Sequence, residues 1–257
     1  MMPDPCRIAM WSGPRNLSTA LMYAFAARGD CTVLDEPLYG AYLSATGIDH
    51  PMRDAVMKSQ PTDHLDAVTE CLGPIPDGKR LYYQKHMTTH MIAAFDRRFL
   101  RSLTNVFLIR HPARVVASYA RKREVPNLTD IGFVQQAEMF DEVAQWTGSA
   151  PLVIDSADLR ANPIMALSGL CSALDIPFIT AMLHWPAGPK SYDGVWAAHW
   201  YNAVHASTGF ENPEGPLPVL CGAEKILAES ALPFYERLSA YSLGTKPKQA
   251  TLSLQTS

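Results

Sequence analysis

The sequence contains no apolar run that approaches the roughly 18 uninterrupted residues of a membrane span. Its N-terminus also lacks a basic region followed by a long apolar stretch, which is the pattern of a secretion signal. We therefore predict a soluble, cytoplasmic protein with no membrane partner.

Neither sign of charge is in excess, because 22 Lys and Arg side chains stand against 25 Asp and Glu side chains. The resulting net charge of −3 creates no general field that would attract nucleic acid or an anionic membrane. Any anion site must therefore be built locally, and no nucleic-acid partner is predicted.

Cysteine is scarce and has no C-x-x-C spacing, and no His, Cys or Asp cluster has metal-ligand spacing. An odd number of widely spread cysteines favours reduced thiols over disulfides or zinc ligation. They are Cys6, Cys31, Cys71, Cys171 and Cys221. We predict that the protein needs no metal.

Apolar residues make up 47% of the 257 residues, enough for a full core in one domain. The predicted strands are 7–11, 31–35, 80–85, 105–110 and 151–155, and the predicted helices are 17–28, 63–72, 88–102, 112–122, 133–145, 163–174 and 222–241. This alternation predicts a three-layer α/β/α fold with a central parallel sheet and ligands at the carboxyl ends of the strands. We assign residues 1–245 to a single domain and predict a disordered tail over 246–257.

The first predicted strand runs into a Gly-Pro turn and then into a helical run. Such a turn directs free backbone N–H groups and the positive end of the helix dipole at one point, where an anion can bind. The predicted phosphate-binding residues are Ser12, Gly13, Pro14, Arg15, Asn16, Leu17, Ser18 and Thr19. The alternative is an ordinary capped strand-to-helix turn.

This loop is not a Walker A motif, because the second glycine and the lysine of that pattern are missing. A kinase or nucleotide hydrolase would need that lysine and a carboxylate for magnesium, a role for which Asp35 is available. That function is kept as an alternative.

A second strand, turn and helix with cations occupy residues 105–123. The loop at 12–19, followed by Ile109-Arg-His-Pro-Ala-Arg-Val-Val-Ala-Ser118, closely resembles the two cofactor signatures of the sulfotransferase family. The resemblance implies a P-loop type of nucleotide-binding fold and 3′-phosphoadenosine 5′-phosphosulfate as the donor, which leaves adenosine 3′,5′-bisphosphate as product. It also implies that the first loop holds the 5′-phosphosulfate, and that Arg110 and Ser118 hold the 3′-phosphate.

Two further blocks, 33–39 and 152–163, match the family in the same order. The resemblance implies that Glu36 lies near the acceptor hydroxyl, so Glu36 is the first candidate base. Its alternative role is a structural anchor that bonds the phosphate loop or pairs with Arg15. Because the lysine of the cytosolic family members is missing from the loop, Arg15 must take its place.

The strand at 80–85 ends in Lys85, followed directly by His86. In the family a lysine and a histidine near this point supply a cation for the sulfuryl group and a base for the acceptor, which makes His86 the second candidate base. Neighbouring strand residues point to opposite faces, so only one of the two can face the site directly. Lys190 is the candidate for covering the nucleotide.

We therefore predict a sulfotransferase that acts on a hydroxyl or amine of a small molecule. A nucleotide-binding relative without activity has the same cofactor residues and stays an alternative. The acceptor and the oligomeric state have no motif in the sequence, and specificity is expected in loops such as 38–62 and 185–220. His50 and His90 are predicted at the surface or in the core, and the core is the preferred place for Trp196, Trp200, Tyr201 and Phe210, one of which could stack on adenine.

Overall fold

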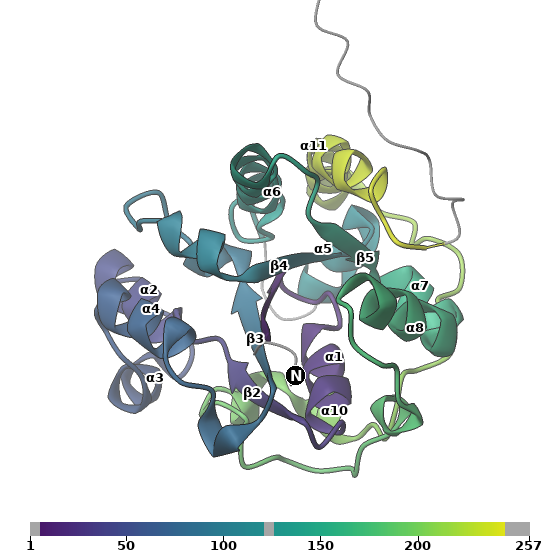
Figure 1. The fold of residues 1–257 in the computed structure, drawn as a ribbon. Helices are drawn as coiled ribbons and strands as arrows, with labels where there is room; N and C mark the ends of the chain where they lie inside the picture. The colour runs from purple at the N-terminus through teal and green to yellow at the C-terminus, as the bar shows by residue number, and fades with distance from the viewer. Residues whose placement is uncertain (1–5, 121–125, 245–257) are drawn as a thin grey trace, which may run out of the picture.

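The computed structural model describes residues 6–120 and 126–244, and within them a sheet of five parallel strands runs through the centre (Figure 1). The strand order is β2-β3-β1-β4-β5. Their bounds are β1 Cys6–Ser12, β2 Cys31–Asp35, β3 Leu81–Met87, β4 Thr104–Ile109 and β5 Leu152–Asp155. The predicted α/β class and parallel sheet are confirmed.

Helices cover both faces of this sheet (Figure 1). The longer ones are α1 Ser18–Ala26, α2 Tyr39–Thr46, α3 Arg53–Ser59, α4 His64–Leu72, α5 Pro112–Ala120, α6 Phe133–Thr147, α8 Pro163–Ala173 and α11 Gly222–Ser239. Shorter ones are α7 Ser156–Ala161, α9 Ala197–Trp200 and α10 Asn202–His205. Side-chain caps begin three of these described helices: the Asp63 carboxylate accepts from the N–H groups of Leu65 and Asp66 at α4, the Asp155 carboxylate accepts from Ala157 at α7, and the Asn162 side chain accepts from Met165 at α8. None of the helices in the described part of the chain is both long enough and apolar enough to cross a bilayer.

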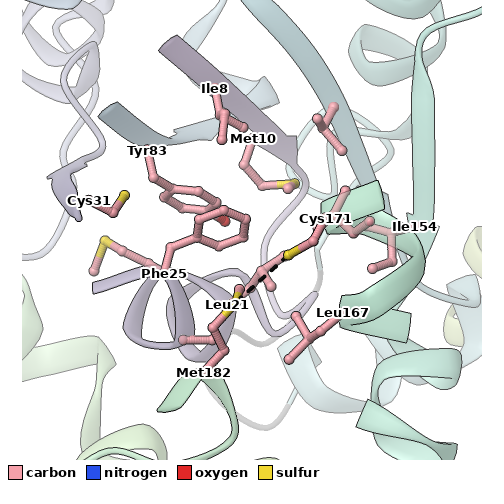
Figure 2. Packing of buried hydrophobic residues seen from close by; sticks show 14 of the residues in the cluster. Ile8, Met10, Leu21, Phe25, Cys31, Tyr83, Ile154, Leu167, Cys171 and Met182 are labelled. Atoms are coloured by element: carbon pink, nitrogen blue, oxygen red, sulfur yellow. Dashed lines mark hydrogen bonds between the residues drawn. The ribbon is translucent and has the colours of Figure 1, made fainter. Parts of the chain in front are cut away.

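The two faces of β1 belong to different cores, as the alternation of a strand requires. Ile8 and Met10 pack against α1 and α8 in one buried cluster (Figure 2). Ala9 and Trp11 point the other way and pack with residues of α6 and α11. The sheet is therefore the middle of three layers.

The carboxyl ends of the inner strands meet at one edge. Ser12 at the end of β1 is opposite Met87 of β3, and it is also opposite Leu108 of β4. Asp35 at the end of β2 is opposite Lys85 of β3. The loops that follow these strands therefore surround a common space, which is where open α/β sheets bind ligands.

The predicted helix at 88–102 is wrong. Two short 3-10 turns, Thr88–His90 and Arg98–Ser102, stand in its place, and the Asp96 carboxylate starts the second by accepting from the Arg98 N–H at 2.9 Å. Helices α2 and α3 lie in the segment 38–62, which was predicted to be loop. The predicted disordered tail, 246–257, lies outside the described residues.

Candidate functional site

A cavity of about 250 Å³ opens at the carboxyl edge of the sheet. Three groups of residues line it. The first loop contributes Pro14, Arg15, Asn16, Leu17, Ser18 and Thr19; the second strand-helix unit contributes Arg110 and Ser118; and the opposite wall includes Glu36, Tyr39, His50, Lys85, His90, Trp200, Tyr201 and Phe210. The predicted loop, the predicted second unit and two predicted catalytic residues thus share one cavity.

The loop between β1 and α1 has an unusual backbone. Arg15 and Leu17 both adopt left-handed conformations, with φ of 65° and 66°. Non-glycine residues seldom do so, and strain of this kind gathers at functional sites. Helix α1 begins at Ser18 without a side-chain cap, so the N–H groups of its first turn face the cavity without a competing side-chain acceptor.

Gly13 and Ser12 support this loop from behind, and neither lines the cavity. A Cβ atom on Gly13 would lie 2.6 Å from the Ile131 carbonyl oxygen, so glycine is required there by close packing and not by a left-handed turn. Ser12 is completely buried. Of the eight predicted loop residues, these two therefore shape the site without facing it.

The two cation-bearing segments are in direct contact. Arg15 Nε donates to the Ser118 hydroxyl at 3.0 Å, and Arg110 Nη1 donates to the Arg15 carbonyl oxygen at 2.6 Å. Three donors from segments far apart in the sequence therefore converge on one end of the cavity. Two arginines and a hydroxyl in this arrangement can hold an oxyanion.

Lys85 lies at the centre of a buried polar cluster on the opposite wall. Its Nζ is 3.0 Å from Asp35 Oδ1 and forms a close ion pair with Glu36 Oε1. Lys85 also donates to the Tyr201 hydroxyl at 2.7 Å, and that hydroxyl donates to Asp35 at 2.8 Å. Burial alone would lower the pKa of Lys85, but Asp35 and Glu36 raise it, so Lys85 is a permanent cation.

Glu36 follows the end of β2 in a left-handed conformation, with φ of 45°. Burial raises the pKa of its carboxyl group, and the attraction of Lys85 offsets part of this effect. The strained backbone turns the side chain toward Lys85, so the alternative pairing of Glu36 with Arg15 is replaced by a pair with Lys85. A carboxylate with a raised pKa suits a group that accepts a proton near neutral pH.

His86 and Lys190 do not line the cavity. His86 points to the other face of β3, where its ring stacks on Trp11 with centroids 4.1 Å apart and burial lowers its pKa to about 3. Lys190 Nζ instead donates to the Pro186 carbonyl oxygen at 2.7 Å. These positions correct both site predictions: Lys85 is the member of its pair that faces the cavity, and Lys190 binds its own loop.

His90 lines the cavity, contrary to its predicted place away from the site. Its ring is stacked between Tyr39, at 4.4 Å, and Tyr42, at 4.9 Å. Its Nδ1 is 3.9 Å from Glu36 Oε2 and has no hydrogen-bond partner among the described residues. Burial lowers the pKa of His90, so the imidazole is neutral at physiological pH. The one feature of the sequence that could have indicated this place for His90 is its position just after the end of β3.

The opposite wall of the cavity is also richer in aromatic rings than expected. Tyr39 hydrogen-bonds through its hydroxyl to His50 Nδ1, and the His50 ring stacks on Trp200 with centroids 5.7 Å apart. Tyr201 and Phe210 line the cavity as well, while Trp196 is buried in the core as predicted. A pocket with apolar faces and few polar groups is typical of a small-molecule site.

The carboxylate that the kinase alternative assigns to magnesium is engaged by other groups of the protein. Asp35, the carboxylate that a kinase would need for magnesium, is bound to Lys85 and Tyr201, and it accepts from the Gly194 N–H at 3.1 Å. In the described part of the chain, no group of three or more His, Cys, Asp or Glu residues is arranged to hold a metal ion.

A family model described as "Sulfotransferase domain" matches residues 6–242. Two Arabidopsis thaliana proteins, branched-chain-amino-acid aminotransferase-like protein 1 and protein 2, are 36% and 35% identical to this chain over 241 and 248 residues. The alignments cover 93% and 96% of this chain, which spans 43% of the length of each relative.

A solved sulfotransferase domain shares the fold. The domain from the curacin biosynthetic pathway superposes with a TM-score of 0.51 at 18% identity and covers 88% of this chain and 97% of that domain. The domain from the Synechococcus PCC 7002 olefin synthase has a TM-score of 0.47 at 18% identity, covering 89% of this chain and 94% of that domain.

Proposed function

Because the chain belongs to the sulfotransferase domain family, we propose that it transfers a sulfuryl group from 3′-phosphoadenosine 5′-phosphosulfate to a hydroxyl or amine of a small molecule. The observation that supports this proposal is the contact of Arg15 with Ser118, which joins, at one end of the cavity, the two segments that we propose bind anions.

The donor has anionic groups at both its 5′ and 3′ positions, and the cavity offers cations and hydroxyls for each. The uncapped N-terminus of α1 and Arg15 suit the 5′-phosphosulfate. Arg110 and Ser118 suit the 3′-phosphate, since a guanidinium can make two parallel charge-assisted bonds to phosphate oxygens. A donor with an anionic group only at its 5′ position would leave Arg110 and Ser118 without a partner on the nucleotide.

In the proposed reaction, the acceptor oxygen or nitrogen attacks the sulfur atom while the bond from sulfur to the phosphate oxygen breaks. The acceptor proton passes to Glu36, and the electron pair of the broken bond stays on the 5′-phosphate of the bisphosphate product. A positioned base of this kind contributes about 10²- to 10⁴-fold to a rate. Lys85 and Arg15 line the same cavity and would stabilise the negative charge that grows during transfer.

The name of the Arabidopsis relatives gives no basis for aminotransferase chemistry here, because this chain covers 43% of their length and residues 6–242 match a sulfotransferase model. The kinase alternative lacks the loop lysine, and Lys85 and Tyr201 engage its candidate magnesium carboxylate, Asp35. A nucleotide-binding family member without activity would have the same cofactor residues, so only a measurement of turnover distinguishes it from an enzyme.

Thermal unfolding in the presence of nucleotides tests the donor. A ligand that binds only the folded protein raises the melting temperature once its concentration passes its dissociation constant. Adenosine 3′,5′-bisphosphate should raise it far more than AMP, and Arg110→Ala should remove the difference. Equal shifts from the bisphosphate and from ATP with magnesium would contradict the proposed donor and favour a kinase.

A further inference from the structure

Glu214 is surrounded by three arginines from three different elements. Its carboxylate pairs with Arg110 after β4, with Arg114 Nε of α5 at 2.8 Å, and with Arg160 Nη1 of α7 at 3.4 Å. The Glu214 side chain is only 4% exposed, and the arginine side chains are 13–17% exposed. A single carboxylate is thus the shared partner of three largely buried guanidinium groups.

One carboxylate does not satisfy this set of cations. Arg160 also pairs with Glu211 at 3.0 Å, so among the described residues three positive charges face two negative ones. Arg110 Nε is buried without a hydrogen-bond acceptor among the described residues. A phosphate monoester carries a charge of about −1.5 to −2 and three acceptor oxygens, so it matches the three arginines better than a carboxylate does.

The segment that carries Glu214 is held mainly through these arginines. Residues 211–219 contain no helix or strand, and most of their side chains are exposed. Arg160 Nε donates to the Asn212 carbonyl oxygen at 2.8 Å, and Arg114 donates to the Gly215 carbonyl oxygen. An anion that took over the arginines would release the segment without disturbing a packed element.

The arginine set adjoins the cavity through Arg110, the member of the set that lines it. Arg110 uses Nη2 for Glu214 and Nη1 for the Arg15 carbonyl oxygen, and Arg15 in turn contacts Ser118. Glu214 is therefore paired with a nitrogen of Arg110 that would otherwise be able to donate to a bound phosphate. Arg114 and Arg160 add two further cations to Arg110 and Ser118, the residues that the sequence analysis assigned to the 3′-phosphate.

We infer that Arg114 and Arg160 complete the site for the 3′-phosphate of the nucleotide with Arg110, and that Glu214 holds this site until the phosphate displaces it. The inference rests on the proposed function and adds two binding residues and an internal competitor to it. Phosphate binding breaks the ion pairs of Glu214, so the segment 211–219 opens when the donor binds. The apparent affinity for the nucleotide is therefore the intrinsic affinity multiplied by the fraction of molecules in which Glu214 does not occupy the site.

Calorimetric titration with adenosine 3′,5′-bisphosphate and with AMP tests the inference. Glu214→Gln should tighten bisphosphate binding about tenfold, as expected if Glu214 occupies the site about nine-tenths of the time, and should leave AMP binding nearly unchanged. Arg114→Ala and Arg160→Ala should each weaken bisphosphate binding selectively. Glu142→Gln is the matched control, because Glu142 forms an ion pair with Arg97 at 2.8 Å away from the cavity and its loss should change neither affinity.

Thermal unfolding checks that each variant is folded. Glu214→Ala is a second variant that lacks the carboxylate. Unchanged or weaker bisphosphate binding in both Glu214 variants would overturn the inference. If the wild type binds the bisphosphate more tightly than AMP, and the Glu214 variants bind the bisphosphate no more tightly than the wild type, the inference fails while the proposed donor stands. If neither the wild type nor the Glu214 variants distinguish the two nucleotides, the proposed donor fails together with it.

Discussion

Arg15 Nε donates to the Ser118 hydroxyl at 3.0 Å, although the two residues are 103 positions apart in the sequence. This bond joins the loop after β1 to the helix after β4, and Arg110 joins the same two elements through the Arg15 carbonyl oxygen. The left-handed backbone at Arg15 is part of the same arrangement. The loop at 12–19 and the segment that carries Arg110 and Ser118 are therefore one structural unit.

Removal of the Arg15 guanidinium should affect chemistry more than binding. In Arg15→Ala, turnover should fall far more than affinity for the bisphosphate product, because the charge that Arg15 faces grows during transfer. Steady-state kinetics and product titration measure the two effects separately. Weaker binding with unchanged turnover at saturation would show that Arg15 only docks the nucleotide.

Glu36→Gln keeps the size of the side chain and removes its basicity. It should lose most of its turnover, about 10²-fold or more, and keep its affinity for the bisphosphate. His86→Asn should cost less, since His86 is stacked on Trp11 outside the cavity. An inactive His86 variant beside an active Glu36 variant would reverse this assignment.

Lys85→Met should destabilise the fold by about 3–5 kcal/mol at neutral pH, because it leaves Asp35 and Glu36 buried together without their cation. Burial and the neighbouring Asp35 charge raise the pKa of the Glu36 carboxyl in the folded state, so the folded state binds more protons and the penalty appears only above the pKa of the unfolded chain. The deficit relative to the wild type should therefore shrink as the pH falls toward the ordinary glutamate pKa of 4.5.

Urea unfolding at several pH values measures this effect, with Lys58→Met, at an exposed lysine of α3, as the control. A deficit that stays constant across the pH range would mean that Lys85 stabilises the fold through packing and not through its charge.

His90→Phe replaces the imidazole with a ring that can still stack between Tyr39 and Tyr42. Stability should not fall, because the substitution removes a buried nitrogen that has no hydrogen-bond partner in the described structure. Turnover should fall, because that nitrogen is 3.9 Å from Glu36 Oε2 in the wall where the acceptor is expected. Lower stability with unchanged turnover would assign His90 to packing alone.

The sequence predicted the parts of the site that depend on local pattern. The loop at 12–19 and the pair of Arg110 and Ser118 each follow a buried strand, and parallel strands end at the same edge, so their meeting could be expected. Strand alternation also predicted that only one of Lys85 and His86 would face the cavity.

Other features depend on contacts between distant segments and could not be predicted. His90 faces the cavity because Tyr39 and Tyr42 clamp its ring, and those tyrosines lie on a helix whose segment had no readable motif. Gly13 is needed because the chain near Ile131 packs against it. The predicted helix at 88–102 failed because two short 3-10 turns take its place, and the Asp96 side chain accepts from the Arg98 N–H where the second begins.

Turnover is the most direct test of the proposed sulfuryl transfer. The protein is incubated with 3′-phosphoadenosine 5′-phosphosulfate and a panel of small alcohols, phenols and amines, and the products are identified by mass spectrometry. We predict a sulfated acceptor together with an equal amount of adenosine 3′,5′-bisphosphate, and loss of both in Glu36→Gln. Tight binding of the bisphosphate without sulfation of any acceptor, or phosphorylation of an acceptor by ATP with magnesium, would contradict this account.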